Sequence, residues 1–308
     1  DKLQSTLPHY AYLRIADGCS NKCSYCAIPL IRGKMRSRKM DNIIEEAKKF
    51  AENGVKELVI VAQDVTAYGI DLYKKYALPD LLKQLCKIDG IKWIRLLYCY
   101  PERMTDELIE TIKTEDKVLN YIDIPIQHCN KEILRNMYRG GDEQSLRELF
   151  AKLRREIPGV VLRTTLITGF PGETEELFSE LAEFVNDIKF ERLGCFAYSA
   201  EEDTPAAEMP DQVDEGERQR RADIITSEQE IRMGEYYAGM VGNTYEVVCE
   251  GFDRYSDMYF GRSMHFAPEI DGMIYFTSAK DKGSLTIGDF VNVKITDVLE
   301  NNLLGERV

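Results

Sequence analysis

The sequence has little positive charge and no long apolar run. Its 308 residues include 40 Lys and Arg against 53 Asp and Glu, which gives a net charge of -13. Because contact with a phosphate backbone requires a basic surface, this balance argues against a free-standing nucleic-acid-binding protein, although it does not exclude a local basic patch. No apolar stretch has the length of a membrane-spanning helix, and the first ten residues, DKLQSTLPHY, lack the pattern of a secretory signal. We therefore expect a cytoplasmic protein without membrane association.

The sequence also lacks a disulfide framework, which is typical of short secreted chains. Five of its eight cysteines are scattered through apolar surroundings, where buried, inert thiols are expected: Cys86, Cys99, Cys129, Cys195 and Cys249. The other three crowd into eight residues after the first predicted strand, with the spacing C-x3-C-x2-C: Cys19, Cys23 and Cys26.

This cysteine cluster has no fourth ligand nearby. A structural zinc site needs four ligands, usually as two C-x2-C pairs, but no second pair is present and the three histidines are scattered. A disulfide with one free thiol fits a reducing compartment poorly. An iron–sulfur cluster on three thiolates is the remaining alternative, and it leaves one iron open to a small chelating molecule. The spacing alone does not identify that molecule.

Six short apolar runs alternate with amphipathic helical patterns over the first two-thirds of the chain. The runs are rich in β-branched and aromatic residues and predict strands: 12–16, 57–62, 93–98, 121–126, 160–168 and 192–198. The helical patterns carry capping residues or a terminal glycine: 41–53, the stretch after Thr105, 145–157 and the stretch after Thr174. This alternation predicts an α/β fold with a parallel sheet and a ligand site at the carboxyl ends of its strands. Six units are too few for a closed eight-stranded barrel, so we expect an open, partial (βα)6 barrel, with a flat doubly wound sheet as the alternative.

The composition changes in the last third of the chain. Residues 201–217 are acidic and contain two prolines, which indicates a domain boundary, and a charged helical pattern follows over about 214–240. Short predicted strands separated by Gly and Asp then favour a small OB-like β-barrel: 245–251, 258–263, 272–278, 285–290 and 291–300. We expect a partial barrel over 1–212, a linker helix over 213–240 and an all-β domain over 241–308.

The motif C-x3-C-x-aromatic-C, with Tyr25 as the aromatic, resembles the signature of the radical S-adenosylmethionine (SAM) superfamily. The resemblance implies a 4Fe-4S cluster on the three cysteines, with SAM on the open iron, and a partial (βα)6 barrel. It implies a reaction in which SAM is cleaved to a 5′-deoxyadenosyl radical that abstracts a hydrogen atom. It also implies SAM contacts from residues at the carboxyl edge of the sheet: Tyr25, Gln63, Asp64, Arg163, Thr165 and Gly169.

Each of these candidates also has a structural interpretation. Gln63 and Asp64 can belong to an ordinary loop, a Thr within a strand is common, and 169–174 reads as a turn that caps the next helix. Arg163 is more unusual, because strands of a covered parallel sheet are mostly apolar, and it could pair with the carboxylate of SAM.

Two further features remain open from the sequence. His128 is a lone histidine near the predicted site, and such residues are more often structural than catalytic. The basic run 32–39 would normally be a solvent-exposed face, but its place after the cluster loop makes contact with a substrate an equal alternative.

The resemblance extends to the methylthiotransferases of this superfamily. It rests on CSYCAIPLIRGKMRSR, RTTLITGFPGET and FAYSAEEDTPA, and on a carboxyl-terminal barrel of the TRAM type. RimO-type enzymes add a methylthio group to the β-carbon of an aspartate in small-subunit ribosomal protein S-twelve, whereas MiaB-type enzymes modify a tRNA adenosine.

Two features favour the RimO type. The stretch after Tyr198 is acidic, where the tRNA-modifying form typically carries an Arg. Residues 241–308 contain eleven Asp and Glu against six Lys and Arg, and this acidic module suits a basic ribosomal protein better than tRNA. A ribosome-binding protein with a purely structural cluster is the alternative outside the enzymes.

Members of this family normally carry an amino-terminal domain with three further cysteines and a second 4Fe-4S cluster, which supplies or carries the inserted sulfur. The sequence contains no second motif of this kind. We therefore expect a fragment that cleaves SAM but does not complete methylthiolation alone. The resemblance implies ribosomal protein S-twelve or the ribosome as partner, with tRNA less suited, and an electron donor such as a flavodoxin-type protein.

Overall fold

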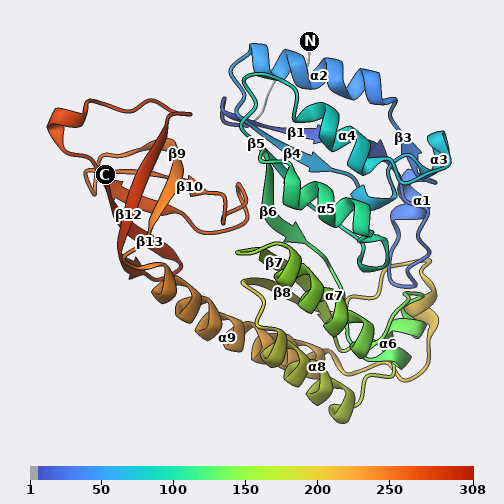
Figure 1. The fold of residues 1–308 in the computed structure, drawn as a ribbon. Helices are drawn as coiled ribbons and strands as arrows, with labels where there is room; N and C mark the ends of the chain where they lie inside the picture. Colours follow the sequence, from blue (N-terminus) through green and yellow to red (C-terminus); the bar gives the residue numbers. More distant parts are fainter. Residues whose placement is uncertain (1–5) are drawn as a thin grey trace.

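The computed structural model describes residues 6–308, which form an α/β domain, a long helix and a small β-barrel (Figure 1). Six parallel strands pair in the order β1-β4-β5-β6-β7-β8. They span Tyr10–Arg14 (β1), Glu57–Val61 (β4), Trp93–Leu96 (β5), Val118–Asp123 (β6), Val161–Thr168 (β7) and Arg192–Ala197 (β8). Because this order follows the chain without a reversal, every crossover winds in the same direction, which excludes the doubly wound alternative. The open, partial (βα)6 barrel is confirmed.

The main helices cover one side of this sheet, opposite the β-barrel (Figure 1). They are α2 (Met40–Glu52), α4 (Leu78–Leu85), α5 (Asp106–Thr114), α7 (Glu143–Glu156) and α8 (Glu175–Ile188). Shorter elements lie at the edges: β2 (Ala16–Asp17), α1 (Ile28–Arg32), β3 (Arg36–Ser37), η1 (Val65–Ala67), α3 (Ile70–Tyr73), η2 (Pro101–Arg103), α6 (Lys131–Asn136) and η3 (Pro205–Glu208). Within residues 6–308, none of the helices combines the length and apolarity that crossing a membrane requires.

Two predicted helix caps are confirmed and one helix begins earlier than predicted. The Oγ1 atoms of Thr105 and Thr174 accept hydrogen bonds from backbone N–H groups three residues later, at 3.2 and 3.4 Å. Helix α7 begins two residues before the predicted 145, because the carboxylate of Asp142 caps it by accepting from the Ser145 N–H at 3.0 Å. The strand predicted over 121–126 is displaced as well, since β6 begins at Val118 and Pro125 has no N–H for the ladder.

The β-barrel is closed, with the strand order β10-β11-β13-β12-β9. Its strands span Thr244–Asp253 (β9), Met258–Ser263 (β10), Ile274–Thr277 (β11), Phe290–Leu299 (β12) and Asn302–Arg307 (β13), with η4 at Lys280–Lys282. The strand predicted over 285–290 was wrong, because Thr286 and Asp289 form a turn in which the Asp289 carboxylate accepts from the Thr286 N–H at 2.8 Å. Strand β13 was missed because its buried positions are Leu303 and a glycine, which leaves no apolar alternation to detect.

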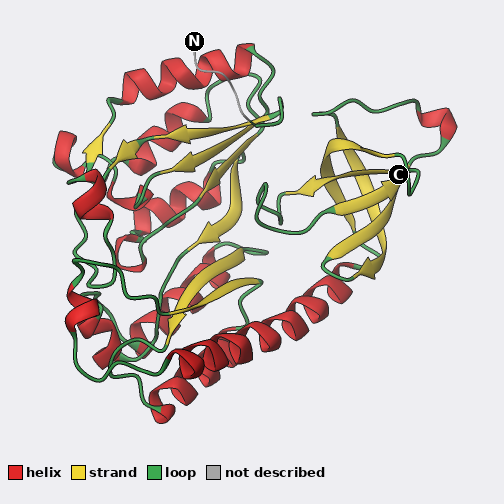
Figure 2. Cartoon of the chain, turned by 180° about the vertical axis from the view of Figure 1, so that it is seen from behind, coloured by secondary structure: helices red, strands yellow, loops and turns green. Residues whose placement is uncertain are grey.

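Helix α9 (Glu215–Met240) runs from the α/β domain to the barrel, which packs against the concave face of the sheet (Figure 2). Alternation along each strand separates the two faces. In β1, Ala11 and Leu13 pack toward the helices, whereas Tyr10 and Tyr12 belong to the cluster shared with the barrel and donate hydrogen bonds to Glu269. The barrel contacts mainly the amino-terminal halves of the strands, so the carboxyl ends stay open.

A buried network of charges joins the two domains. The Glu57 carboxylate accepts from Arg95 Nε at 2.7 Å and from Arg262 Nη2 of the barrel at 2.8 Å. Arg262 Nε also donates to Glu250, whose Oε1 atom lies 2.9 Å from His9 Nε2. All five residues are at most 5% exposed. Since Glu57 and Arg95 of the sheet each bind a group of the barrel, Arg262 and the Met264 carbonyl, the two domains are expected to unfold together.

We expect Arg262→Ala to lower the free energy of unfolding by about 3 to 5 kcal/mol, because it leaves the buried Glu57 and Glu250 carboxylates without one of their cations. The only tryptophan, Trp93, packs against Phe290 of the barrel with ring centroids 4.8 Å apart, so its fluorescence reports on this interface during urea unfolding. Lys75→Ala, which breaks the exposed pair with Asp80, is the control and should leave the midpoint nearly unchanged. Equal midpoints for the two variants would contradict the role of the network.

The same network predicts a loss of stability in acid. Burial raises the pKa of Glu57, but Arg262 and Arg95 together outweigh it and lower the pKa from 4.5 to about 2. The carboxylate therefore contributes its full stability above pH 4.5 and loses it as the pH falls toward 2. The difference in unfolding midpoint between the wild type and Glu57→Gln should shrink across this range. A difference that stays constant from pH 5 to pH 3 would contradict the lowered pKa.

Candidate functional site

The three clustered cysteines lie on a loop that follows β2. Its first residue, Gly18, has φ 73°, and a Cβ atom there would lie 2.5 Å from the Lys34 carbonyl oxygen. Only glycine fits such a close approach in this left-handed conformation. Hydrogen bonds from Cys19 N to Gly33 O and from Cys26 N to Cys23 O, both 3.1 Å, then fold the loop back on itself. As a result, all three free thiols line one cavity.

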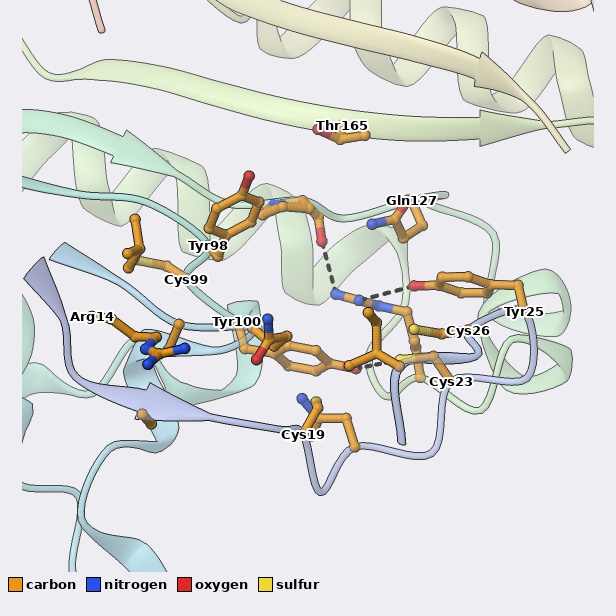
Figure 3. Close-up of a pocket in the computed structure, with 18 residues that line it drawn as sticks. Arg14, Cys19, Cys23, Tyr25, Cys26, Tyr98, Cys99, Tyr100, Gln127 and Thr165 are labelled. Carbon is orange, nitrogen blue, oxygen red and sulfur yellow. Dashed lines mark hydrogen bonds between the residues drawn. The ribbon is translucent and has the colours of Figure 1, made fainter. Parts of the chain in front are cut away.

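This cavity has a volume of about 480 Å³ and opens at the carboxyl ends of the strands (Figure 3). Besides the cysteine loop, the segments after β4, β5 and β6 line it, together with Thr165 of β7. It therefore lies where the alternation of strands and helices predicts a ligand site.

A buried arginine and two tyrosines stand beside the thiols. Arg139 donates through Nη2 to the Pro125 carbonyl at 2.8 Å, lies 3.4 Å from the Tyr25 hydroxyl, and stacks 4.1 Å from the centre of the Tyr100 ring. The Tyr100 hydroxyl lies 3.4 Å from Cys23 Sγ. Burial raises the pKa of the Cys19 thiol, and a hydrogen bond from the backbone N–H of Asn21 offsets part of this effect. Neither Arg139 nor Tyr100 carries a local signal in the sequence, because only the fold brings them to the cysteines.

The three thiols offer the donor set of an iron–sulfur cluster. Each thiolate of a 4Fe-4S cluster binds a different iron, so three cysteines can hold such a cluster and leave one iron open. A structural zinc site instead needs four ligands on one ion. The donor set therefore fits an iron–sulfur cluster.

The predicted SAM contacts divide into two groups. Tyr25, Gln63 and Thr165 line the cavity with the cysteines. Among the residues that the structure describes, Asp64, Arg163 and Gly169 lie outside this lining.

Asp64 and Arg163 are bound by neighbouring side chains. The buried Asp64 carboxylate accepts from Asn21 of the cysteine loop at 3.0 Å and from Arg103 at 2.5 Å. Arg163 donates to Asp123 at 2.8 Å. Both residues therefore support elements around the cavity in this structure.

His128 and Gly169 meet at one buried carboxylate, that of Glu173. The Gly169 N–H donates to Glu173 Oε1 at 2.8 Å, and Arg221 of α9 donates to the same oxygen at 2.8 Å. His128 Nε2 lies 3.3 Å from Glu173 Oε2, and its Nδ1 accepts from the Asn130 N–H. Gly169 has φ 69°, and a Cβ atom there would clash with the Arg218 side chain. This network shapes the turn after β7, which favours the structural interpretation of His128.

Two cavity residues beyond the predicted set adopt left-handed backbone conformations. Gln127 (φ 71°) is buried, and its Oε1 atom has no partner within residues 6–308. It lines the cavity and offers an acceptor to a ligand that carries a hydroxyl or amine. Tyr98 (φ 65°) is held by the Asp123 carboxylate, which accepts from its N–H at 2.9 Å, and the residue is 47% exposed. Such strained positions often mark functional sites.

The basic run after the cluster gathers partly around Asp17. The guanidinium groups of Arg32 and Arg36 lie 3.9 and 3.7 Å from its carboxylate. Arg38 instead pairs with Glu46 at 2.5 Å and donates to the Arg14 carbonyl at 2.6 Å. The run is therefore only partly solvated, and Arg32 and Arg36 lie beside Asp17 at the end of β2.

Comparison with known proteins identifies both domains. The family model described as "Radical SAM superfamily" matches residues 13–185, and the "TRAM domain" model matches residues 241–308. The chain is 50% identical over 305 residues to "Ribosomal protein uS12 methylthiotransferase RimO" of Clostridium botulinum, covering 99% of this chain and 67% of that protein. The protein of the same name from Caldanaerobacter subterraneus is also 50% identical, with 99% and 69% covered.

Solved structures support the fold. Coproporphyrinogen III oxidase (HemN) from Escherichia coli, described as a radical SAM enzyme, superposes with a TM-score of 0.54 at 18% identity, covering 75% of this chain and 54% of that one. The family model implies SAM and a 4Fe-4S cluster as cofactors. The chain therefore belongs to the radical SAM superfamily and, within it, to the RimO-type methylthiotransferases.

Proposed function

We propose that this chain uses a 4Fe-4S cluster on Cys19, Cys23 and Cys26, together with SAM, to add a methylthio group to the β-carbon of an aspartate in ribosomal protein uS12. The observation that carries this proposal is the convergence of three free thiols on one cavity at the carboxyl ends of the strands. The 50% identity to relatives named as uS12 methylthiotransferases supports the choice of target.

The cavity residues fit these cofactors by their chemistry. When bound, the reduced cluster and SAM supply a 5′-deoxyadenosyl radical that abstracts a hydrogen atom from the substrate. Tyr25, Gln63 and Thr165 line the space for SAM, and the unpartnered Gln127 Oε1 atom can accept a hydrogen bond from a SAM hydroxyl or amine. Arg139 places a positive charge beside the thiolates. Three predicted contacts outside the lining would act by positioning the surrounding loops: Asp64, Arg163 and Gly169.

The charge of the TRAM barrel supports a protein target. Residues 241–308 carry a net charge of -5, which would repel the phosphates of tRNA and attract a basic ribosomal protein. We further propose that reduction comes from a flavodoxin-type donor in the cytoplasm. Insertion of sulfur would need a second cluster in a domain additional to residues 1–308, whose sequence holds one three-cysteine motif.

We expect Cys19→Ala, Cys23→Ala and Cys26→Ala each to abolish the iron–sulfur cluster and the cleavage of SAM, because each removes one of three thiolate ligands. The measurements are iron and sulfide content after anaerobic reconstitution and formation of 5′-deoxyadenosine after reduction. Cys99→Ala is the matched control, since Cys99 lines the same cavity outside the motif, and it should retain iron. Full iron in any of the three variants, or uptake of zinc in place of iron and sulfide, would contradict the assignment.

We expect the enzyme with its complete set of domains to modify uS12 and not tRNA. Mass spectrometry of uS12 after incubation with SAM, sulfide and reductant should show a methylthio group on one aspartate. The labelled protein target should bind more tightly than labelled tRNA at equal salt, because the barrel is acidic. Tight tRNA binding that weakens steeply with salt would favour the tRNA-modifying alternative instead.

A further inference from the structure

Arg14 ends β1, which is the edge strand of the open barrel. Along β1, Tyr10 and Tyr12 face the concave side, whereas Ala11 and Leu13 pack toward the helices. Because side chains alternate along a strand, Arg14 continues the concave row. Its side chain lines the cavity, and in Figure 3 it lies on the far side of Tyr100 from Cys23 and Cys26. Arg14 therefore marks the end of the cavity away from the cysteines.

The charges of the cavity are one-sided. Among the described residues that line it, the charged groups other than the thiols are Arg14 and Arg139, and none is Asp or Glu. Arg139 is buried and bound to Pro125 and Tyr25 on the cysteine side. Arg14 is 51% exposed in its side chain, and its contact with the nearest carboxylate, that of Asp17, is 3.9 Å long, beyond hydrogen-bond distance. Arg14 is thus the cation whose hydrogen-bond donors remain available to a second ligand.

We propose that Arg14 binds the side-chain carboxylate of the aspartate that is to be modified. This inference rests on the proposed function, in which the β-carbon of an aspartate must enter the cavity and brings its carboxylate with it. A carboxylate that leaves water needs a cation or hydrogen-bond donors in exchange, and the planar guanidinium can supply two parallel donors. With Arg139 beside the cysteines, Arg14 at the opposite end is positioned to recognise the substrate. It acts as a specificity-determining residue.

Two neighbouring arginines provide matched controls. Arg32 and Arg36 also lie at 3.9 and 3.7 Å from Asp17, and their side chains are 53% and 68% exposed. Neither is among the residues that line the cavity within the described part of the chain. Both have the same charge as Arg14 and the same acidic neighbour, but they lie outside the cavity. Substituting them therefore distinguishes general electrostatic attraction of the substrate from direct contact with its carboxylate.

The test uses the enzyme with its complete set of domains, its clusters reconstituted, and two uS12 peptides that differ only in Asp or Asn at the target position. The wild type should bind the Asp peptide about ten- to a hundredfold more tightly than the Asn peptide, as expected for hydrogen bonds to a charged group. Arg14→Gln should remove this preference while the dissociation constant for SAM stays at the wild-type value. Arg14→Lys should restore part of the preference, and Arg36→Gln should retain it.

Three results would overturn the inference alone, and a fourth would overturn the proposed function as well. Arg14→Gln could keep the preference for the Asp peptide, or it could weaken SAM binding without affecting the peptides, which would assign Arg14 to the SAM carboxylate. Arg36→Gln could reduce the preference as much as Arg14→Gln, which would indicate general attraction only. If the wild type binds neither peptide and leaves uS12 unmodified, the proposed function itself is wrong and the inference falls with it.

Discussion

The Glu57 carboxylate sits in a buried position of β4 and finds its two cations in different domains, Arg95 of the sheet and Arg262 of the barrel. A buried charge with half its partners removed is strongly destabilising, so the barrel is needed to complete the sheet. It covers the amino-terminal half of the concave face through this network and through the loop that holds Glu269 and Asp271. The carboxyl half stays uncovered, and the cavity lies there.

Because side chains alternate along a strand, one inward-facing row of residues supplies both the half of the concave face under the barrel and the half that lines the cavity. In β1 the inward row runs from Tyr10 and Tyr12 at the barrel to Arg14 at the cavity. In β7 it runs from Val161 at the barrel to Thr165 at the cavity. Arg163 lies between them and pairs with Asp123, which in turn holds the strained backbone of Tyr98. Arg163 is thus a polar residue within a parallel strand, and it supports the cavity through Asp123 and Tyr98.

The sequence predicts what depends on neighbouring residues and misses what depends on the fold. The helix caps at Thr105 and Thr174, the strand periodicity and the cysteine spacing are all local signals, and the fold class follows from them. Arg139 carries no such signal, because its place beside the cysteines arises from packing against Tyr25, which lies more than a hundred residues away in the sequence. Gln63 and Asp64 are neighbours in the sequence, yet only one of them lines the cavity. Gln63 lines the cavity, whereas Asp64, with its shorter side chain, turns back to cap η1.

The charge of the whole chain and the charge of its cavity have opposite signs, and they act over different distances. A net charge of -13 attracts a basic protein from afar, an effect that salt screens beyond roughly 8 Å. Inside the cavity, Arg14 and Arg139 favour an anionic group at contact distance, where less water intervenes and screening is weaker. A basic ribosomal protein that presents one aspartate satisfies both conditions, since its overall charge suits the surface and its acidic side chain suits the cavity. A tRNA phosphate would suit the positive cavity, but the negative surface of the chain would repel tRNA as its phosphates approached the acidic barrel.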